Sequence, residues 1–539
     1  MNPSIAISGD RLRRPRGWKS LRAPTIVHYV SLVVGLGALL WTGRGTWFYL
    51  DEWDFMWGPE AARRLVEGHN GHWSVVPILV WNAVQRVFGL AHYWPFLLLV
   101  IAAHLTLAHL LWRLILRLGS DPWVATALAS VFVLYGSAAE NILWGFQVGY
   151  IGAIAFVVGA LLVVLRPTMR GWAVGCAAAL LILGVASSGT SLPFLIPVAV
   201  VCLRMHGWAK TIVAVGSTVV VYAIWFFFLA GDNPTAIYRA SGPIDYLFGI
   251  PAFVGRMFVD GFTTLTPVPL FGIVLTTGIA GWLVYRLGRA WLSVPDLTAT
   301  AMALAGVVFA VLTAYSRLHA DSDGTRARYI YVLVVACLPA IAAGLTSIAR
   351  GSSRRILAIT GLVSVVLAYN VGLLILNGEK VVSRDAHARE IVSASLDLAH
   401  EYPDDVDRSA AVYPSLVPRS VDDLLVLEER YKLTPSSFGE SARLTALTYV
   451  GLNVVDQLSP LSHCTSVPVG GVVVAGPEGI AIGGSPDRDV TLQATGVSAS
   501  GDSRTLTFPR SGASLVLSTP ESVRFKVESA TSPVKMCGR

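Results

Sequence analysis

Residues 24–43, PTIVHYVSLVVGLGALLWTG, contain no charged side chain, and the acidic stretch Asp51-Glu52-Trp53-Asp54 follows them closely. A helix needs about 20 apolar residues to cross a bilayer, so residues 24–43 predict a membrane-spanning helix. Carboxylates are costly to desolvate at a membrane, which makes ionisable residues there candidates for function. We therefore expect a first spanning helix whose outer end carries a cluster of acids.

The composition of the whole chain extends this prediction. Of its 539 residues, 54% are hydrophobic and 14% are charged, whereas soluble domains carry about 25% charged residues. The candidate spanning helices are the apolar runs 24–43, 93–113, 122–138, 147–165, 171–187, 190–204, 210–230, 267–286, 298–316, 329–349 and 356–376. The run 75–90 is excluded, because Asn82, Gln85 and Arg86 recur on one side at helical spacing and predict an amphipathic helix in the interface. Residues 59–67 predict a second helix of this kind.

The distribution of charge predicts an orientation. Lys and Arg concentrate in the N-terminal tail and in the loops that this helix count places inside, while Asp and Glu concentrate in the other loops. We therefore predict a multi-pass protein of the plasma membrane. It has a basic cytoplasmic tail (1–23), a transmembrane domain (24–376, with a first outer loop at 44–92) and an extracytoplasmic domain (377–539). The net charge of +7 does not indicate nucleic acid, because the basic residues are spread between apolar runs.

The tail 377–539 differs in composition from the rest of the chain. It begins with a helical stretch and ends in short alternating runs such as 513–518 and 522–529, separated by Gly, Pro, Ser and Asp. This pattern predicts an α+β or β-rich domain. Cys464 and Cys537 are candidates for a disulfide if the tail lies in an oxidising compartment.

The first outer loop, 44–92, is rich in side chains that carry chemistry. Its acids are followed by His69, His72 and Trp73. Its tryptophans fit an aromatic belt at the membrane surface, although aromatic faces also stack on sugars. Asp and His together are ligands for divalent cations, but no spacing here is diagnostic, so metal binding stays open.

Later outer loops add polar residues between apolar runs. These residues are Glu140, Asn141, Gln147, Tyr238, Arg239, Arg326, Arg328 and Tyr329. Arginines at Arg326 and Arg328 run against the charge bias, and their paired N–H groups suit a phosphate. The alternative is that they snorkel at a helix end. Glu140 is equally well explained as a helix cap.

Residues 24–165 resemble the GT-C superfamily of membrane glycosyltransferases, and most closely its protein O-mannosyltransferase and aminoarabinose-transferase branch. Asp51-Glu52 matches that branch's acidic pair after the first helix. The stretch His69 to Pro77 lies where the branch has a His-Pro turn, although here residues 73–76 separate His72 from the proline. Over 166–376 the resemblance is one of helix count only. The Ala-, Val-, Gly- and Arg-rich composition is similar to that of actinobacterial membrane proteins.

The resemblance implies a fold, a reaction and partners. The donor would be a sugar on a polyprenyl phosphate, and the acceptor a cell-envelope glycan, lipid or protein. Asp51 would be the general base of an inverting transfer, Glu52 would orient it, and Asp54 would be the second candidate base. Arg326 and Arg328 would neutralise the departing lipid phosphate. Trp53, His69, His72, Glu140 and Asn141 would line the sugar pocket. No cofactor beyond an optional divalent cation is implied.

Two other function classes remain open. A lipid-linked glycan flippase or transporter would use the same loops to hold a lipid head-group. Transport sites usually place ionisable residues at mid-membrane, however, and here the acids gather at one end of the spanning stretches. A non-catalytic assembly protein of the cell envelope would tolerate replacement of Asp51.

Overall fold

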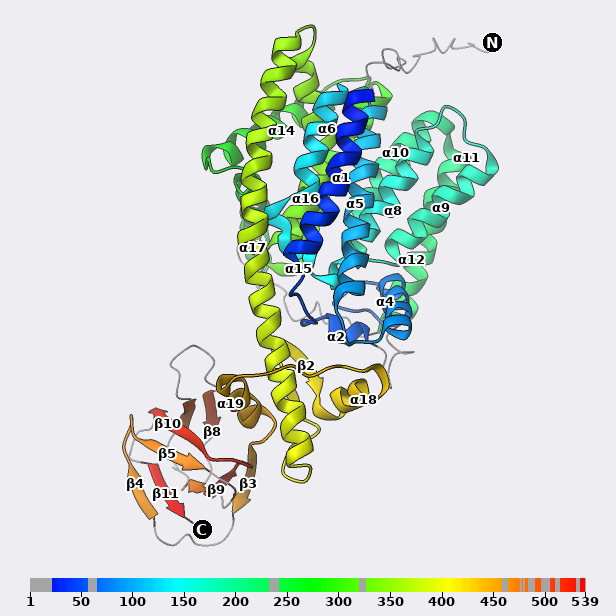
Figure 1. Ribbon diagram of the computed structural model, residues 1–539. Helices are drawn as coiled ribbons and strands as arrows, with labels where there is room; N and C mark the ends of the chain where they lie inside the picture. Colours follow the sequence, from blue (N-terminus) through cyan, green and yellow to red (C-terminus); the bar gives the residue numbers. More distant parts are fainter. Residues whose placement is uncertain are drawn as a thin grey trace, which may run out of the picture. The chain divides into compact units, whose positions relative to one another are not determined.

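The protein is described by a computed structural model (Figure 1). The described residues are 22–56, 65–231, 242–318, 326–457, 464–475, 477, 480–482, 490–495, 505–508, 514–529 and 534–538. They divide into two compact units. The helical unit contains Met1–Arg44, Pro59–Trp81 and Phe96–Val381, and the second unit contains Gly45–Gly58, Asn82–Pro95 and Val382–Arg539.

Ten helices in the described part of the chain are long and apolar enough to cross a membrane. They are α1 (Arg22–Thr42), α5 (Trp94–Arg117), α6 with α7 (Pro122–Leu143), η3 with α8 (Gly145–Val164), η4 with α10 (Gly189–His206), α11 with α12 (Trp208–Phe228), α14 (Leu270–Leu287), α15 (Val294–Arg317), α16 (Ala327–Ala349) and α17 (Ser353–Glu401). By length and composition, these helices fit the predicted polytopic helical fold. The one predicted run that is not among these ten, 171–187, forms the shorter helix α9 (Gly171–Val185).

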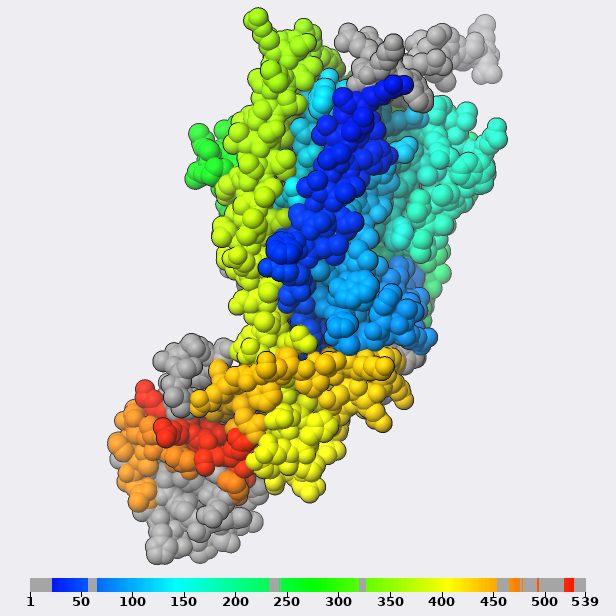
Figure 2. Space-filling model, viewed as in Figure 1, coloured from blue at the N-terminus to red at the C-terminus, as the bar shows by residue number. Residues whose placement is uncertain are grey.

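The helical unit buries most of some helices and leaves others with an apolar outer face. α8 packs against α9, α15 against α16, and α1 against α6. α8 is apolar on all sides and mostly buried, whereas α1 lies on the surface of this unit (Figure 2). Val30, Val33 and Trp41 of α1 are exposed by 54%, 70% and 68%. Exposed apolar stripes of this kind suit helices that face lipid.

Two segments differ from the sequence predictions. α13 (Pro243–Thr263) is a 21-residue helix within the segment that we expected to be the outer loop 231–266. Its charged residues, Asp245, Arg256 and Asp260, suggested a loop, but Pro at the first helical position and periodic apolar residues support a helix. α4 (Val75–Phe88) is the predicted amphipathic helix. Its polar residues Asn82 and Gln85 are buried, and the second interfacial helix expected at 59–67 lies mostly outside the described residues.

A close backbone crossing holds α17 in the helical unit. A Cβ added at Gly136, in the short helix η2 (Gly136–Ala138), would lie 2.1 Å from the carbonyl oxygen of Asn370 and 2.3 Å from the backbone nitrogen of Leu374. Two side-chain amides of α17 add hydrogen bonds, one to η2 and one to the segment that follows α13. Asn377 Nδ2 donates to the Gly136 carbonyl (3.1 Å), and Asn370 Nδ2 donates to the Leu265 carbonyl (3.0 Å). Only glycine fits at this crossing.

The second unit combines helices with small antiparallel sheets. α17 is one continuous helix of 49 residues that begins in the helical unit and ends in the second unit. A hairpin follows, β1 (Ala411–Tyr413) with β2 (Val417–Ser420), and then α18 (Val421–Tyr431) and α19 (Glu440–Tyr449). A four-stranded sheet has the order β5-β10-β7-β8 and a five-stranded sheet the order β3-β9-β6-β11-β4. The bounds of their strands are β3 (Asn453–Gln457), β4 (Cys464–Val467), β5 (Val472–Ala475), β6 (Ile480–Ile482), β7 (Val490–Thr495), β8 (Thr505–Phe508), β9 (Ser514–Ser518), β10 (Val523–Ser529) and β11 (Val534–Gly538). The prediction of a C-terminal region with a β-rich end is confirmed.

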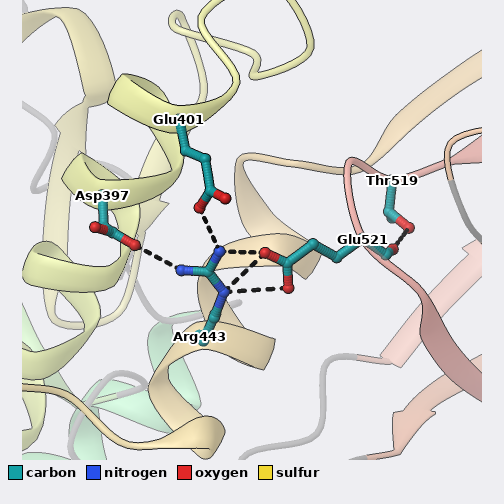
Figure 3. A network of polar contacts seen from close by, with 5 residues as sticks. All are labelled: Asp397, Glu401, Arg443, Thr519 and Glu521. Carbon is teal, nitrogen blue, oxygen red and sulfur yellow. Dashed lines mark hydrogen bonds and ion pairs between the residues drawn. The ribbon is translucent and has the colours of Figure 1, made fainter.

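Arg443 of α19 joins three parts of the second unit (Figure 3). Its guanidinium donates to Asp397 (2.6 Å) and Glu401 (2.7 Å) of α17, and to Glu521 just before β10 (2.9 Å from Nε). The hydrogen bond from Arg443 lowers the pKa of Glu401 below its ordinary value. The ion pair between Arg443 and Glu401 therefore stabilises the fold at pH values above the ordinary pKa of a glutamate. This stabilisation is lost as the pH falls through the lowered pKa of Glu401.

The two tail cysteines lie on paired strands. In the antiparallel pairing of β11 with β4, Cys537 is directly opposite Cys464. Residues opposite each other in an antiparallel pair have Cα atoms about 4.5–5.5 Å apart, which lies within the range that a disulfide needs. The register is thus compatible with the disulfide that the sequence suggested.

The crossing at Gly136 predicts a position that cannot accept even one methyl group. Gly136→Ala should destabilise the helical unit by about 1–3 kcal/mol or more, because backbone atoms rather than flexible side chains would have to move. Gly175→Ala is the matched control, because nothing lies within 4 Å of its added Cβ, and it should be neutral or stabilising. Thermal unfolding of both variants in detergent tests this, and equal melting temperatures would contradict it.

The register of β4 and β11 predicts that three of the five cysteines are thiols. Alkylation of the denatured, unreduced full-length protein should add three labels, on Cys176, Cys202 and Cys337, and Cys464→Ser should add a fourth by releasing Cys537. Intact mass spectrometry counts the labels. Five labels on the unaltered protein isolated from its membrane would show that the bond does not form.

Candidate functional site

The acids of the first outer loop lie on one short turn of helix in the second unit. α2 (Glu52–Phe55) has Asp51 at its N-cap, and the Asp54 N–H donates to the Asp51 carbonyl (3.1 Å). Side chains three residues apart share a face of a helix. The carboxylates of Asp51 and Asp54 are accordingly half-buried and offer oxygens within 4.8 Å of each other. The turn therefore presents a pair of carboxylates from one side.

Glu52 is the one acid of this turn that is completely buried. Its Oε1 accepts a hydrogen bond from the Tyr93 hydroxyl (2.6 Å), and its Oε2 accepts from the Tyr49 backbone N–H (2.8 Å). Hydrogen bonds to a carboxylate are stronger than those between neutral groups, and an unpaired buried carboxylate would be very costly. Glu52 thus holds the turn in shape.

Trp53 of the turn packs within an aromatic cluster of the second unit. Trp53 is fully buried, and its ring lies 5.5 Å from that of Trp47 and 5.8 Å from that of Phe48, measured between centroids. Phe48 in turn packs edge-on against Tyr93 at 5.1 Å. The structure places Trp53 in the core of the second unit rather than at a sugar-accessible surface.

The histidines of the first outer loop form a tight turn in the helical unit. The His69 N–H donates to the His72 carbonyl (2.9 Å), and the His72 N–H donates to the His69 carbonyl (2.8 Å). The two central residues, Asn70 and Gly71, have φ angles of +49° and +79°. An Asn-Gly pair is the usual choice for this type I′ turn, because both positions need a left-handed backbone. The two histidines are thus paired through their backbones across this turn.

His72 lies among cationic and aromatic neighbours. Its ring contacts that of Tyr150 edge-on at 5.4 Å, and a Cβ on Gly189 would lie 2.9 Å from its Nδ1. Burial, together with the positive charges of Arg317 and Arg328, lowers the pKa of His72 to about 3. The imidazole is therefore neutral at physiological pH and can accept a hydrogen bond at one ring nitrogen.

Arg328 is the arginine that the structure brings into this cluster. Its charge acts on His72, and the charge of Glu140 acts on Arg328. It also forms a side-chain hydrogen bond with the buried Tyr329. Four of the predicted site residues, His72, Glu140, Arg328 and Tyr329, thus fall in one neighbourhood of the helical unit. Arg326, the other predicted phosphate ligand, is exposed.

Arg317 and Tyr150 were not predicted as site residues from the sequence. Arg317 occupies the last turn of α15, and Tyr150 lies near the start of α8. Both end or begin apolar runs, where they looked like ordinary boundary residues. A cation in the last turn of a long apolar helix was the available signal.

Asn141 and Gln147 form a buried amide pair nearby in the chain. Asn141 Nδ2 donates to Gln147 Oε1 (3.3 Å), and the side chains are 1% and 0% exposed. Asn141 Oδ1 and Gln147 Nε2 have no hydrogen-bond partner among the residues that the structure describes. Trp73 stacks on the buried Trp225 at 5.5 Å between ring centroids. Tyr238 and Arg239 lie outside the described residues.

No protein-family model matches this chain, and no curated protein matches its sequence. The case for its function therefore depends on the chemistry of the two groups of residues above.

The contacts of Glu52 predict a specific loss of stability. Glu52→Gln replaces one of its two accepting oxygens by an NH₂ group, which faces either the Tyr93 hydroxyl or the Tyr49 N–H. We expect the second unit to lose about 1–3 kcal/mol of stability. Thermal unfolding of the purified protein measures this, with the exposed Asp422→Asn as control. If both variants melt like the unaltered protein, Glu52 is not the residue that holds this turn.

Proposed function

We propose that this chain is a membrane glycosyltransferase that moves a sugar from a polyprenyl-phosphate donor to a hydroxyl of an extracytoplasmic cell-envelope acceptor, with inversion at the anomeric carbon. The observation that carries the proposal is the pair Asp51 and Asp54. They lie together on one face of a turn that the buried Glu52 holds. A base must be accessible and well positioned, and this turn offers both properties.

The chemistry assigned to the acids is a single displacement. The acceptor hydroxyl gives its proton to Asp51 while its oxygen forms a bond to the anomeric carbon. The bond from that carbon to the phosphate oxygen breaks at the same time, and polyprenyl phosphate leaves with its electron pair. Attack from the face opposite the leaving group inverts the configuration. Asp54, three residues on, is the second candidate for the base.

The cationic cluster of the helical unit supplies groups that suit the donor. Arg317 and Arg328 provide positive charge and paired N–H donors for a phosphate. His72 stays neutral there, because burial and these arginines lower its pKa to about 3. It therefore adds a hydrogen-bonding group without adding a positive charge beside the two arginines. Arg317 takes the place that we first gave to the exposed Arg326. The membrane-spanning character of the helices fits a donor that is anchored in the bilayer by its lipid.

Replacement of Asp51 tests the proposal. Asp51→Asn should lower transfer by about 10²- to 10⁴-fold, because an amide cannot take up the hydroxyl proton. The measurement is transfer of labelled sugar in membrane vesicles from a panel of short-chain polyprenyl-phosphate hexoses and pentoses, at equal protein level. Asp54→Asn, assayed alongside, identifies the base if Asp51 is not the one.

The control for this experiment is the exposed Asp422→Asn, which should transfer at the normal rate. Full transfer by both Asp51→Asn and Asp54→Asn would remove the general-base mechanism. Lipid flipping that depends on the protein, with no sugar transfer from any donor in the panel, would favour the flippase instead.

A further inference from the structure

The backbone just before Asp51 adopts an unusual conformation. Leu50 has a φ of +47°, a left-handed geometry that only two other non-glycine residues, Asn70 and Lys432, adopt in the described part of the chain. Such a conformation is costly for a branched apolar side chain and persists only where neighbours enforce it. Here the Leu50 N–H donates to the carbonyl of Leu416 (2.8 Å). The conformation of Leu50 sets the direction in which the chain enters the acidic turn.

A second contact holds the backbone on the other side of Asp51. Arg419 of β2 is 7% exposed, and its Nε (3.0 Å) and Nη2 both donate to the carbonyl of Trp53. Its Nη1 pairs with Asp423 (3.3 Å). The last carbonyls of a helix have no partner within that helix, and α2 is only one turn long. Arg419 therefore supplies the hydrogen bonds that this end of the turn lacks.

We infer that Arg419 is a positioning residue for the general base, and that the segment Leu416–Asp423 is part of the catalytic apparatus rather than of an appended domain. The inference rests on the proposed function. The Leu416 carbonyl accepts from the Leu50 N–H, and Arg419 donates to the Trp53 carbonyl. These two contacts hold the backbone one and two residues from Asp51. Since a misplacement of about 1 Å can lower a rate by about 10²-fold, they matter for the base itself.

The full-length protein in detergent, with Arg419→Met and Arg419→Lys, tests the inference. Arg419→Met removes all three donors, whereas Arg419→Lys keeps the charge and can donate one hydrogen bond to the Trp53 carbonyl. The matched control is Arg430→Met, an exposed arginine on the neighbouring helix α18. Each variant is assayed for kcat and KM with the polyprenyl-phosphate sugar that supports the highest transfer by the unaltered protein.

Hydrogen exchange provides a readout that does not depend on activity. The amides of residues 49–56 should exchange at least about tenfold faster in Arg419→Met than in Arg430→Met. We expect kcat to fall about 10- to 100-fold in Arg419→Met with KM for the donor unchanged, and to recover in part in Arg419→Lys. Values of kcat are corrected for the fraction of folded protein. This correction separates positioning from a loss of stability alone.

The outcomes distinguish the two levels of the argument. If Asp51→Asn and Asp54→Asn abolish transfer but Arg419→Met keeps the normal kcat, the proposed function stands and the positioning role is overturned. Unchanged exchange at residues 49–56 overturns it as well. If neither acid variant loses transfer, the general-base mechanism of the proposed function fails, while faster exchange in Arg419→Met would still show that Arg419 holds the turn.

Discussion

The enclosed carboxylate of Glu52 is the interaction on which the acidic turn depends. A buried carboxylate needs hydrogen bonds in place at all times, and Glu52 obtains them from the Tyr93 hydroxyl and the Tyr49 N–H. These partners come from the segment just before α2 and from the residue just before α5. Glu52 therefore fixes the shape of the turn, on which Asp51 and Asp54 are half-buried.

The helical unit also gathers polar side chains, and most of these are cationic or neutral. There the polar groups are cations and a neutral histidine, gathered near Tyr150 where apolar helices end. Partial burial favours the neutral form of an imidazole but cannot neutralise an arginine. The cluster therefore keeps a positive character that suits an anionic ligand.

Local pattern was sufficient for much of the fold. Uncharged runs predicted all ten of the long apolar helices, and the alternating runs after residue 500 predicted strands. Helical spacing excluded α4 as a full-length span. α13 was missed because Asp245, Arg256 and Asp260 resemble a loop when only charge is counted, although apolar residues repeat at helical spacing between them. Of the site, the sequence predicted the acids, His72, Glu140 and Arg328, but not Arg317 or Tyr150.

The sequence by itself determined what depends on neighbours along the chain. Apolar length decided the spanning helices, the spacing of Asp51 and Asp54 decided their common face, and Asn70-Gly71 decided the histidine turn. Tertiary structure alone decided which acid is buried, because Glu52 is the one whose carboxylate receives the Tyr93 hydroxyl, 41 residues away along the chain. It also decided that Arg419, 366 residues from Trp53 along the chain, completes the turn. Partners so distant in sequence are brought together by the packing of the whole unit, and no local pattern encodes them.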